Sequence, residues 1–449
     1  MKSTSFYVKP SLRNTKSSVA FFLLTACYLM SCTLLEGSAT QQPAEHEEPY
    51  AIYLTWQQDP LTTMTIDWQT QPEDEAVTTL RYQKADSERD AWMEVEAESF
   101  PFPYSDRTVH RVELTGLEPG TSYRFHAGEF NRSYSFRTMP ETITDEPLVF
   151  AAGGDTRPAA WTFEEHYREE LGLGAMEDLN RIALQYDVDF IVWAGDLAYA
   201  DGREDRLYRW DWWFEANMNS LIDDGGRVVP ILVGIGNHES LTSYVYRADD
   251  YEQTDIWRLE NAPYFYTLFA FPGQPGYDVI DFGDYLSLVS LDSDHTNPVI
   301  GLQTEWLESV LAERTGIPHV FPYYHVPAYP SHRSPDGGVQ TRVRENWVPL
   351  FEKYGVRVAF EAHDHAYKRT YPIRDGKIDP TGITYIGDGA WGRGPRSGNS
   401  RDEWYINKFA EEYHAIITTL HGTHQHFLIV NDRGEIIDEF PTTPRPESN

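Results

Sequence analysis

Short apolar runs that end in metal-ligating residue types constrain this chain more than any other feature. Helix-like stretches such as "TEWLESVLAER" separate these runs, a pattern typical of an α/β layered domain. Ligand sites in open α/β sheets lie at the carboxyl ends of strands, so the side chains that end the runs are predicted to meet at one rim. In chain order the runs end at Asp155, Asp196, Asn237-His238, His325 and His363/His365.

This set of side chains suits hard or borderline metal ions. Carboxylate, amide oxygen and imidazole ligands favour first-row divalent or trivalent ions, whereas the only cysteines, Cys27 and Cys32, lie at the extreme N-terminus. The number of ligands suits two ions, and one carboxylate can bridge ions about 3.5–4 Å apart, as in two-metal phosphate ester hydrolysis. Taken alone, "GD" after a strand is more often a turn, "GNH" indicates little, and "HDH" is equally compatible with a surface histidine pair. The ordered set favours a dinuclear site.

A different pattern precedes the α/β region. Segments such as "MTIDWQT" and "SYRFHAGEF" alternate apolar and polar residues, and turn signals separate them at the spacing typical of a small β-sandwich. We therefore predict a β-sandwich over residues 49–142 and an α/β domain over 146–440. Residues 33–48 are predicted to be a linker, and residues 441–449 a disordered tail.

The N-terminus has the features of an export signal. Residues 1–32 carry Lys2, Lys9, Arg13 and Lys16 before the apolar run "VAFFLLTACYLMSC", which is short for a membrane span. The segments "LTAC" and "LMSC" each resemble a bacterial lipobox, ending at Cys27 and Cys32. We expect an exported lipoprotein, held at the membrane through its lipid, in the periplasm or on the outer surface. The alternative is a secreted protein cleaved later, near "EGSAT".

The charge balance is strongly acidic. The chain has 37 basic and 70 acidic residues, a formal net charge of −33. Such a surface argues against general binding of nucleic acids or anionic membranes.

The ordered motifs resemble those of a known family. "GGDTR", "GDLAY", "GNHE", "YYHVPAY" and "AHDHAY" are similar to the motifs of the calcineurin-like metallophosphoesterases, and Tyr199 in "GDLAY" points to their purple acid phosphatase branch. The stretch "VHRVELTGLEPGTSYRF" is similar to the fibronectin-III-like domain of plant-type members. The resemblance implies a fibronectin-III-like β-sandwich followed by an α/β metallophosphoesterase domain, in which two sheets are flanked by helices.

The resemblance also implies a set of metal ligands. A ferric ion would bind Asp155, Asp196, Tyr199 and His365, because a phenolate is a hard anionic donor that suits Fe(III). A divalent Fe, Zn or Mn ion would share the bridging Asp196 and bind Asn237, His325 and His363. The alternative for Tyr199 is an aromatic ring packed beside the site.

The implied activity is hydrolysis of small phosphate monoesters by a metal-activated hydroxide, without a covalent phosphoenzyme. His238 would serve the leaving oxygen, and Asn237 would also contact substrate. His332 is the candidate for a second catalytic and substrate-binding histidine; it could instead be a surface residue, with Arg333 receiving the anion. Arg157 is equally compatible with an anion contact and with a salt bridge.

Three positions depart from the family pattern: Arg157, Ala362 and Lys368. They remove no ligand but leave the substrate class open, so a phosphodiesterase or nucleotide hydrolase on the same dinuclear site is the first alternative. A second alternative is a surface-binding β-sandwich protein with a vestigial metal site. That alternative is disfavoured because all seven ligand positions are filled.

Overall fold

The computed structural model describes residues 48–72, 74, 78–87, 91–157, 174–397 and 402–442, which belong to one compact unit. The predicted signal peptide with Cys27 and Cys32, the predicted linker up to residue 47, and the tail from residue 443 lie outside the described residues. Across the described ranges, no helix is both long enough and apolar enough to cross a membrane.

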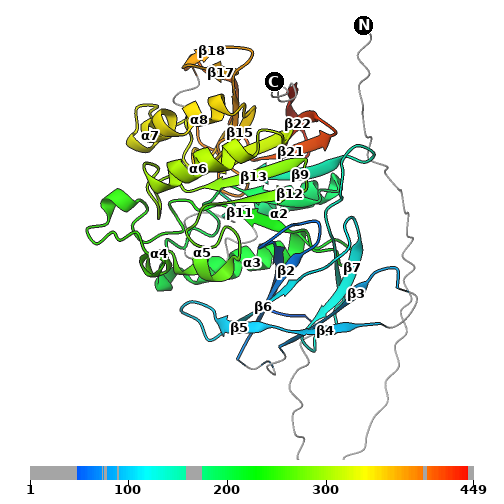
Figure 1. Cartoon of the computed structure of the whole chain (residues 1–449). Coiled ribbons are helices and arrows are strands. Elements are labelled where there is room, and N and C mark those ends of the chain that lie inside the picture. The colour runs from blue at the N-terminus through cyan, green and yellow to red at the C-terminus, as the bar shows by residue number, and fades with distance from the viewer. Residues whose placement is uncertain are drawn as a thin grey trace, which may run out of the picture. The chain divides into compact units, whose positions relative to one another are not determined.

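The N-terminal domain is a β-sandwich, coloured blue to cyan in Figure 1. Its sheets have the strand orders β1-β2-β6-β5 and β4-β3-β7-β8. In β7 the side chains of Tyr123, Phe125 and Ala127 are buried and alternate with less buried neighbours, which is the period of a half-buried strand. The strands are β1 (Ala51–Thr55), β2 (Met64–Thr70), β3 (Thr79–Lys84), β4 (Met93–Glu96), β5 (Glu98–Pro101), β6 (Thr108–Leu114), β7 (Ser122–Ala127) and β8 (Tyr134–Arg137).

The C-terminal domain contains two larger sheets. The first has the order β11-β10-β9-β21-β22-β23, with β9, β10 and β11 parallel. Its strands are β9 (Leu148–Gly153), β10 (Phe190–Trp193), β11 (Ile231–Val233), β21 (His414–His421), β22 (His424–Asn431) and β23 (Ile436–Thr442).

The second sheet has the order β12-β13-β14-β15-β19-β16-β20, with β13, β14, β15 and β19 parallel. A small hairpin of β17 (Ile373–Arg374) and β18 (Lys377–Ile378) lies outside it. The strands of the sheet are β12 (Asp278–Phe282), β13 (Leu286–Leu291), β14 (His319–Tyr324), β15 (Val358–Glu361), β16 (Tyr367–Thr370), β19 (Thr384–Gly387) and β20 (Ile406–Ala410).

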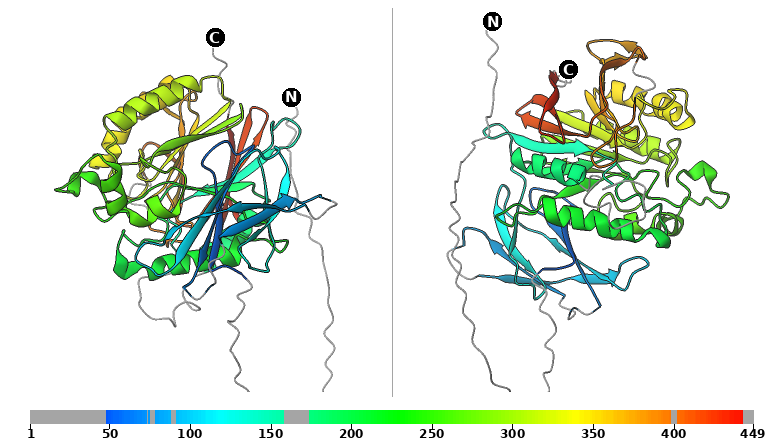
Figure 2. Two further views of the ribbon diagram at one scale, coloured as in Figure 1. Left: turned by 60° about the horizontal axis from the view of Figure 1, so that its bottom comes forward. Right: turned by 180° about the vertical axis from the view of Figure 1, so that it is seen from behind.

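The helices form outer layers over these two sheets (Figures 1 and 2). On the first sheet, α2 and α3 cover one face, where Trp213 contacts Trp193 of β10. On the second sheet, α6, α7 and α8 cover one face. The helices are α2 (Gly174–Gln185), α3 (Tyr208–Ser220), α4 (Asp255–Asn261), α5 (Pro263–Leu268), α6 (Leu302–Glu313), α7 (Gly338–Asn346) and α8 (Val348–Lys353), with 3-10 turns at Glu204–Arg206 and Val245–Arg247.

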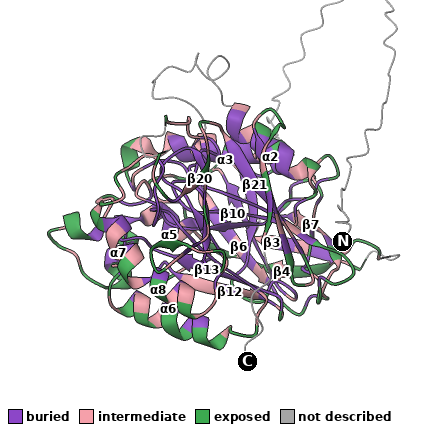
Figure 3. Cartoon of the chain, turned by 90° about the horizontal axis from the view of Figure 1, so that it is seen from above, coloured by how far each residue is buried: buried purple, intermediate pink, exposed green. Residues whose placement is uncertain are grey.

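The inner faces of the two sheets pack against each other. Phe150 of β9 contacts both Phe321 of β14 and Phe360 of β15, with ring centroids 6.1 and 6.0 Å apart. The central strands are therefore buried on both faces, which explains why they read as continuous apolar runs in the sequence. Figure 3 shows these strands buried, with the outer faces of α6, α7 and α8 exposed. The predicted architecture of a β-sandwich followed by two sheets flanked by helices is confirmed.

The sandwich packs on the helical layer of the first sheet. Tyr53 of β1 contacts Phe214 of α3 with ring centroids 5.3 Å apart, and Arg107 forms a 2.7 Å ion pair with Asp211 of α3. Arg111 of β6 donates to the Leu268 carbonyl at the end of α5 at 3.0 Å. These contacts tie the sandwich to the sides of α3 and α5.

One predicted boundary is wrong by two residues. β23 continues to Thr442, whereas we expected the disordered tail to begin at residue 441. Pro441 and Thr442 pair with His426 and Gln425 of β22, and the Thr442 hydroxyl donates to the Gln425 side chain at 2.5 Å. Strand pairing with a distant segment therefore orders residues whose local composition suggests a tail.

Candidate metal centre

The predicted ligands follow strands of both large sheets. Asp155 follows β9, Asp196 and Tyr199 follow β10, and Asn237 follows β11, all in the first sheet. In the second sheet His325 follows β14, and the segment with His363 and His365 follows β15. The carboxyl ends of two facing sheets, rather than of one, thus form the predicted rim, and all seven side chains come within a few ångströms of another member of the set.

Asp155, Tyr199 and His365 form a first group. The Tyr199 hydroxyl donates to Asp155 Oδ1 at 2.7 Å and lies 3.0 Å from His365 Nε2. His365 Nε2 is 2.9 Å from the same carboxylate oxygen. These three side chains are 0–2% exposed, so their polar atoms face one another in a water-poor environment.

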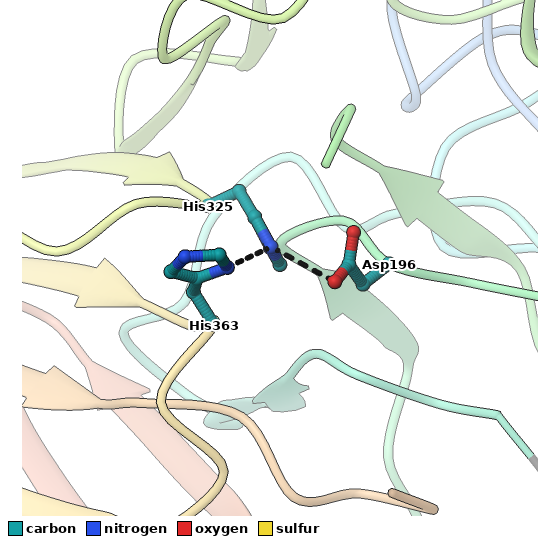
Figure 4. A group of neighbouring side chains, drawn as sticks. All are labelled: Asp196, His325 and His363. Atoms are coloured by element: carbon teal, nitrogen blue, oxygen red, sulfur yellow. Dashed lines mark hydrogen bonds and ion pairs between the residues drawn. The ribbon is translucent and has the colours of Figure 1, made fainter. Parts of the chain in front are cut away.

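Asp196, Asn237, His325 and His363 form a second group. His325 Nε2 lies 3.1 Å from Asp196 Oδ2, 3.3 Å from Asn237 Oδ1 and 2.9 Å from His363 Nδ1. Figure 4 shows Asp196, His325 and His363 converging with their polar atoms toward one another. His325 Nδ1 donates to the Ala194 carbonyl at 3.0 Å, which directs Nε2 into the group.

The loops that carry these ligands adopt an unusual backbone. Asp155, Asp196, Tyr199, His363 and His365 all have φ between +55° and +79°. Non-glycine residues in this left-handed region are uncommon and each costs on the order of 1–3 kcal/mol, and such residues cluster at functional sites. Five of the seven predicted ligands share this feature, which indicates that the fold holds them in place against local preference.

Glu239 of the "GNHE" motif holds the two ligand loops of the first sheet together. Its buried carboxylate accepts hydrogen bonds from the backbone N–H groups of Asp196 and Leu197, both at 2.8 Å, and of Gly236 at 2.7 Å. Gly236 is required for the close approach of these loops, because a Cβ there would lie 2.3 Å from Asp196 Oδ1. The carboxylate of Asp196 is therefore positioned from both sides.

The protonation of the metal-free cluster follows from burial and from neighbouring charges. Burial, reinforced by the Asp155 and Asp196 carboxylates, raises the pKa of Tyr199 well above its ordinary value. Burial opposes charge on His325, but the Asp196 carboxylate together with those of Asp155 and Glu239 more than offsets burial and raises the pKa of His325 to about 9. The phenolate form of Tyr199 would therefore need a nearby cation, and a proton on His325 Nε2 occupies the centre of the second group.

His238 lies at the edge of the cluster with its ring in a fixed orientation. Its backbone N–H donates to Asp196 Oδ1 at 2.8 Å, and its ring stacks on Tyr199 with centroids 4.2 Å apart. Nδ1 donates to the Asp201 carboxylate, which is also paired with Arg206. Nε2 is 4.0 Å from Asp196 Oδ2, and the side chain is 31% exposed, so one ring nitrogen is accessible beside the cluster.

The two remaining predicted residues, His332 and Arg157, lie near the cluster. His332 Nδ1 donates to the Ser397 carbonyl at 2.6 Å, and its backbone N–H donates to Asp364 at 2.7 Å. The guanidinium of Arg157 lies 5.9 Å from the centre of the Tyr199 ring, and burial lowers the pKa of Arg157 to about 10. Substrate contact by either residue stays a prediction.

The donor set fits two metal ions. Metal–ligand bonds of about 2.0–2.2 Å place neighbouring ligand atoms of one ion about 3 Å apart. The distances of 2.7–3.0 Å in the first group and 2.9–3.3 Å in the second have this spacing.

Comparison with known proteins agrees with the motifs. Residues 49–138 match the family profile of the purple acid phosphatase N-terminal domain, and residues 165–367 match that of the calcineurin-like phosphoesterases. The chain belongs to the purple acid phosphatase branch of the calcineurin-like metallophosphoesterases. It is thereby placed in a family of phosphatases.

Individual relatives are distant in sequence. Purple acid phosphatase 18 of Arabidopsis thaliana is 26% identical over 72% of this chain and 67% of its own length. Acid phosphatase type 7 of Mus musculus is 24% identical over 92% of this chain and 95% of its own. Among the first plant relatives, the chain spans 57–67% of the relative's length.

A solved structure shows the same fold. Purple acid phosphatase PPD1 from yellow lupin (Lupinus luteus) seeds aligns with a TM-score of 0.72 over 88% of this chain and 74% of its own, at 16% identity.

In the present protein, reasoning from sequence motifs missed several residues of the candidate metal centre. Glu239 stands in the quoted motif "GNHE" and Asp201 lies two residues after "GDLAY", but only the fold shows that they hold Asp196 and His238. His295 is buried against His325 with ring centroids 5.5 Å apart, and Tyr244 places its hydroxyl 3.5 Å from His363 Nε2. No sequence signal marks these two, because both come from loops without a metal-ligand motif.

Proposed function

We propose that this protein hydrolyses phosphate monoesters at a dinuclear Fe(III)–M(II) centre, with Fe, Zn or Mn as the divalent ion. The observation that carries the proposal is the pair of donor groups around Asp196, one containing the Tyr199 phenol and one containing Asn237 and two histidines. When bound, such a centre supplies positive charge to the phosphate oxygens and makes a water molecule a competent nucleophile near neutral pH.

The protein's own residues would hold the ions and serve the leaving group. Asp155, Tyr199 and His365 would bind the ferric ion, and Asn237, His325 and His363 the divalent ion, with Asp196 shared. A phenolate oxygen and carboxylates are hard donors, which supports Fe(III) at the first position.

His238 would supply a proton to the leaving oxygen. Its Nδ1–H is bound to Asp201, which fixes the orientation of the ring, and its Nε2 faces the cluster edge. Burial lowers the pKa of His238 while the Asp196 and Glu239 carboxylates oppose that shift, so a protonated ring here gives up its proton readily. In the proposed reaction the oxygen of water bonds to phosphorus while the bond from phosphorus to the ester oxygen breaks. The ester oxygen leaves as an alcohol after taking a proton from His238 Nε2, and the proton released by the attacking water restores the proton of His238 through solvent.

Metal loading and a single substitution test this function. Protein loaded with iron and zinc is assayed against p-nitrophenyl phosphate and bis(p-nitrophenyl) phosphate, beside Asp196→Asn and the control Asp205→Asn, whose carboxylate is exposed and paired with Arg203. We expect monoester hydrolysis, lowered by roughly 1,000-fold or more in Asp196→Asn, equal to about 4 kcal/mol of transition-state stabilisation. Hydrolysis of the diester alone would replace the proposal with a phosphodiesterase, and two-metal protein without either activity would refute it.

We further propose that the chain is exported and anchored through a lipid on Cys27 or Cys32. The basic N-terminus, the following apolar run and the two lipobox-like segments support this location. Fractionation of cells that express the full chain, beside Cys27→Ser and Cys32→Ser variants, tests it. One variant should move from the membrane fraction to the soluble fraction, and membrane association that survives loss of both cysteines would contradict lipid anchoring.

A further inference from the structure

The loop that follows β19 lies directly against the first group of predicted ligands, Asp155, Tyr199 and His365. The backbone N–H of Arg393 donates to the Asp155 carbonyl at 2.8 Å, and that of Arg396 donates to the His365 carbonyl at 2.7 Å. Gly389 has φ +87°, and a Cβ there would lie 2.0 Å from Asp155 Oδ2, so only glycine allows this approach. Residues 388–397 are therefore held against the ligand loops at two points.

This loop places the charge of Arg396 beside the centre. The half-buried guanidinium interacts electrostatically with the Tyr199 phenol and the Asp155 carboxylate, and also with the guanidinium of Arg333. Burial lowers the pKa of Arg396, yet an arginine keeps its charge in proteins. Within the part of the chain that the structure describes, this guanidinium has no ion pair and no hydrogen bond.

The neighbouring loop after β14 adds further basic groups to the same side. His332 Nδ1 donates to the Ser397 carbonyl at 2.6 Å, which joins the two loops. Arg333 donates to the His363 carbonyl and to Asp364 Oδ1, both at 2.6 Å, so the Asp364 carboxylate offsets its charge. Arg396 is therefore a positive charge on this side of the centre that forms an ion pair with no carboxylate of the described residues, and Arg393 of the same loop lies within electrostatic range of it.

An uncompensated cation here matters because of the charge of the whole chain. The chain has 70 acidic and 37 basic residues, and such a surface repels anionic substrates. A guanidinium without a carboxylate partner can instead form a bidentate pair with a phosphate group.

We propose that Arg396 forms a second anion subsite, and that the preferred substrates carry a second phosphoryl group on the leaving group. This inference rests on the proposed phosphatase function. The terminal phosphoryl group occupies the metal centre while the second one pairs with Arg396. Water supplies the oxygen that bonds to the terminal phosphorus, and the bond from that phosphorus to the bridging oxygen breaks. The bridging oxygen keeps the electron pair on the phosphorylated product, and the proton of water goes to that product or to solvent.

Two substrate pairs test the subsite. ADP and AMP share the nucleoside and form the anhydride-linked pair. Hydrolysis of ADP leaves the phosphorylated product AMP, whereas hydrolysis of AMP leaves adenosine, which has no phosphoryl group. Fructose 1,6-bisphosphate and fructose 6-phosphate form the corresponding ester-linked case. The quantity measured is the ratio of kcat/KM for the doubly phosphorylated substrate to that for its singly phosphorylated partner. It is determined for metal-loaded wild type, Arg396→Gln, Arg396→Lys and the control Arg181→Gln, an exposed residue on α2 paired with Glu177.

Arg396→Gln should lower this ratio by roughly 10- to 100-fold for at least one pair, mainly through KM, as expected for loss of one charged hydrogen-bonding partner. Arg396→Lys should restore part of it, and Arg181→Gln should match wild type. The pair that responds identifies whether the second phosphoryl group is anhydride-linked or ester-linked. Equal ratios in wild type and Arg396→Gln, with hydrolysis of AMP or fructose 6-phosphate intact, would overturn the subsite while leaving the phosphatase standing. Wild type inactive on all four compounds and on p-nitrophenyl phosphate would instead overturn the proposed function.

Discussion

Replacing Tyr199 by phenylalanine separates the role of its oxygen from that of its ring. The substitution removes only the hydroxyl that donates to Asp155 at 2.7 Å, while the ring can keep its stacking on His238. A hydrogen bond to a charged acceptor contributes about 1.5–3 kcal/mol, so the metal-free variant should lose stability within that range.

The loaded variant should show a much larger effect. Loss of an outer-shell partner already weakens metal binding by about 10- to 100-fold, so loss of an anionic direct ligand should weaken iron binding by more than about 100-fold. The visible band expected for a phenolate bound to Fe(III) should disappear, since the described residues offer no second tyrosine within hydrogen-bonding distance of Asp155.

The assay is a visible spectrum with metal analysis of protein purified without chelator. The matched control is Tyr323→Phe, a fully buried tyrosine on β14 whose hydroxyl lies 3.5 Å from the Val233 carbonyl. A purple wild type, a purple Tyr323→Phe and a colourless Tyr199→Phe are expected. A Tyr199→Phe variant that keeps both the band and its iron would refute ligation by Tyr199. A colourless wild type with two bound metals would refute the ferric assignment.

Three further predictions concern the supports of the centre. Glu239→Gln replaces one carboxylate oxygen by an N–H₂ group facing a backbone N–H donor, so the free energy of unfolding should fall by about 1–3 kcal/mol. An unchanged thermal unfolding curve and metal content would contradict the role of Glu239 in holding the two ligand loops together. Because the pKa of His325 is about 9 in the metal-free protein, metal must displace a proton below that pH. Metal affinity at the divalent site should therefore weaken about tenfold per pH unit on going from pH 8 to pH 6. The proton released from His325 on metal binding is measurable by titration calorimetry in buffers of different ionisation heat. Metal binding without proton release would exclude a protonated His325 in the metal-free protein. Lys368→Met strands the buried carboxylates of Glu361 and Asp388, and should lower stability by about 3–5 kcal/mol in thermal unfolding. The double variant Lys368→Met/Glu361→Gln should recover part of that loss. A Lys368→Met variant as stable as wild type would show that the ion pairs of Lys368 are dispensable for stability.

The role of Lys368 depends on contacts with other strands that its sequence position does not reveal. Lys368 departs from the family pattern, and the sequence offered no reason for the change. In the fold its ammonium group binds Glu361 and lies 2.9 Å from Asp388 Oδ1, so it joins β16 to the ends of β15 and β19. The His365 backbone N–H donates to the Asp388 carbonyl at 2.6 Å, which links this buried network to the ligand segment.

The sequence by itself predicted the two-domain architecture, which depends on local patterns, and the resemblance of its motifs to a known family implied the ligand set. Continuous apolar strands with metal-ligating residues at their ends predict an α/β site, and alternation predicts the sandwich. Only the tertiary structure decided which sheet supplies each ligand, because strand order depends on pairing between residues far apart in sequence. It also decided which groups hold the ligands in place: Glu239, Asp201 and Lys368 act through contacts with loops that local sequence does not reveal. For the same reason the charge of Arg396 beside Tyr199 follows from a glycine-mediated approach of two loops, and not from the composition of an acidic chain.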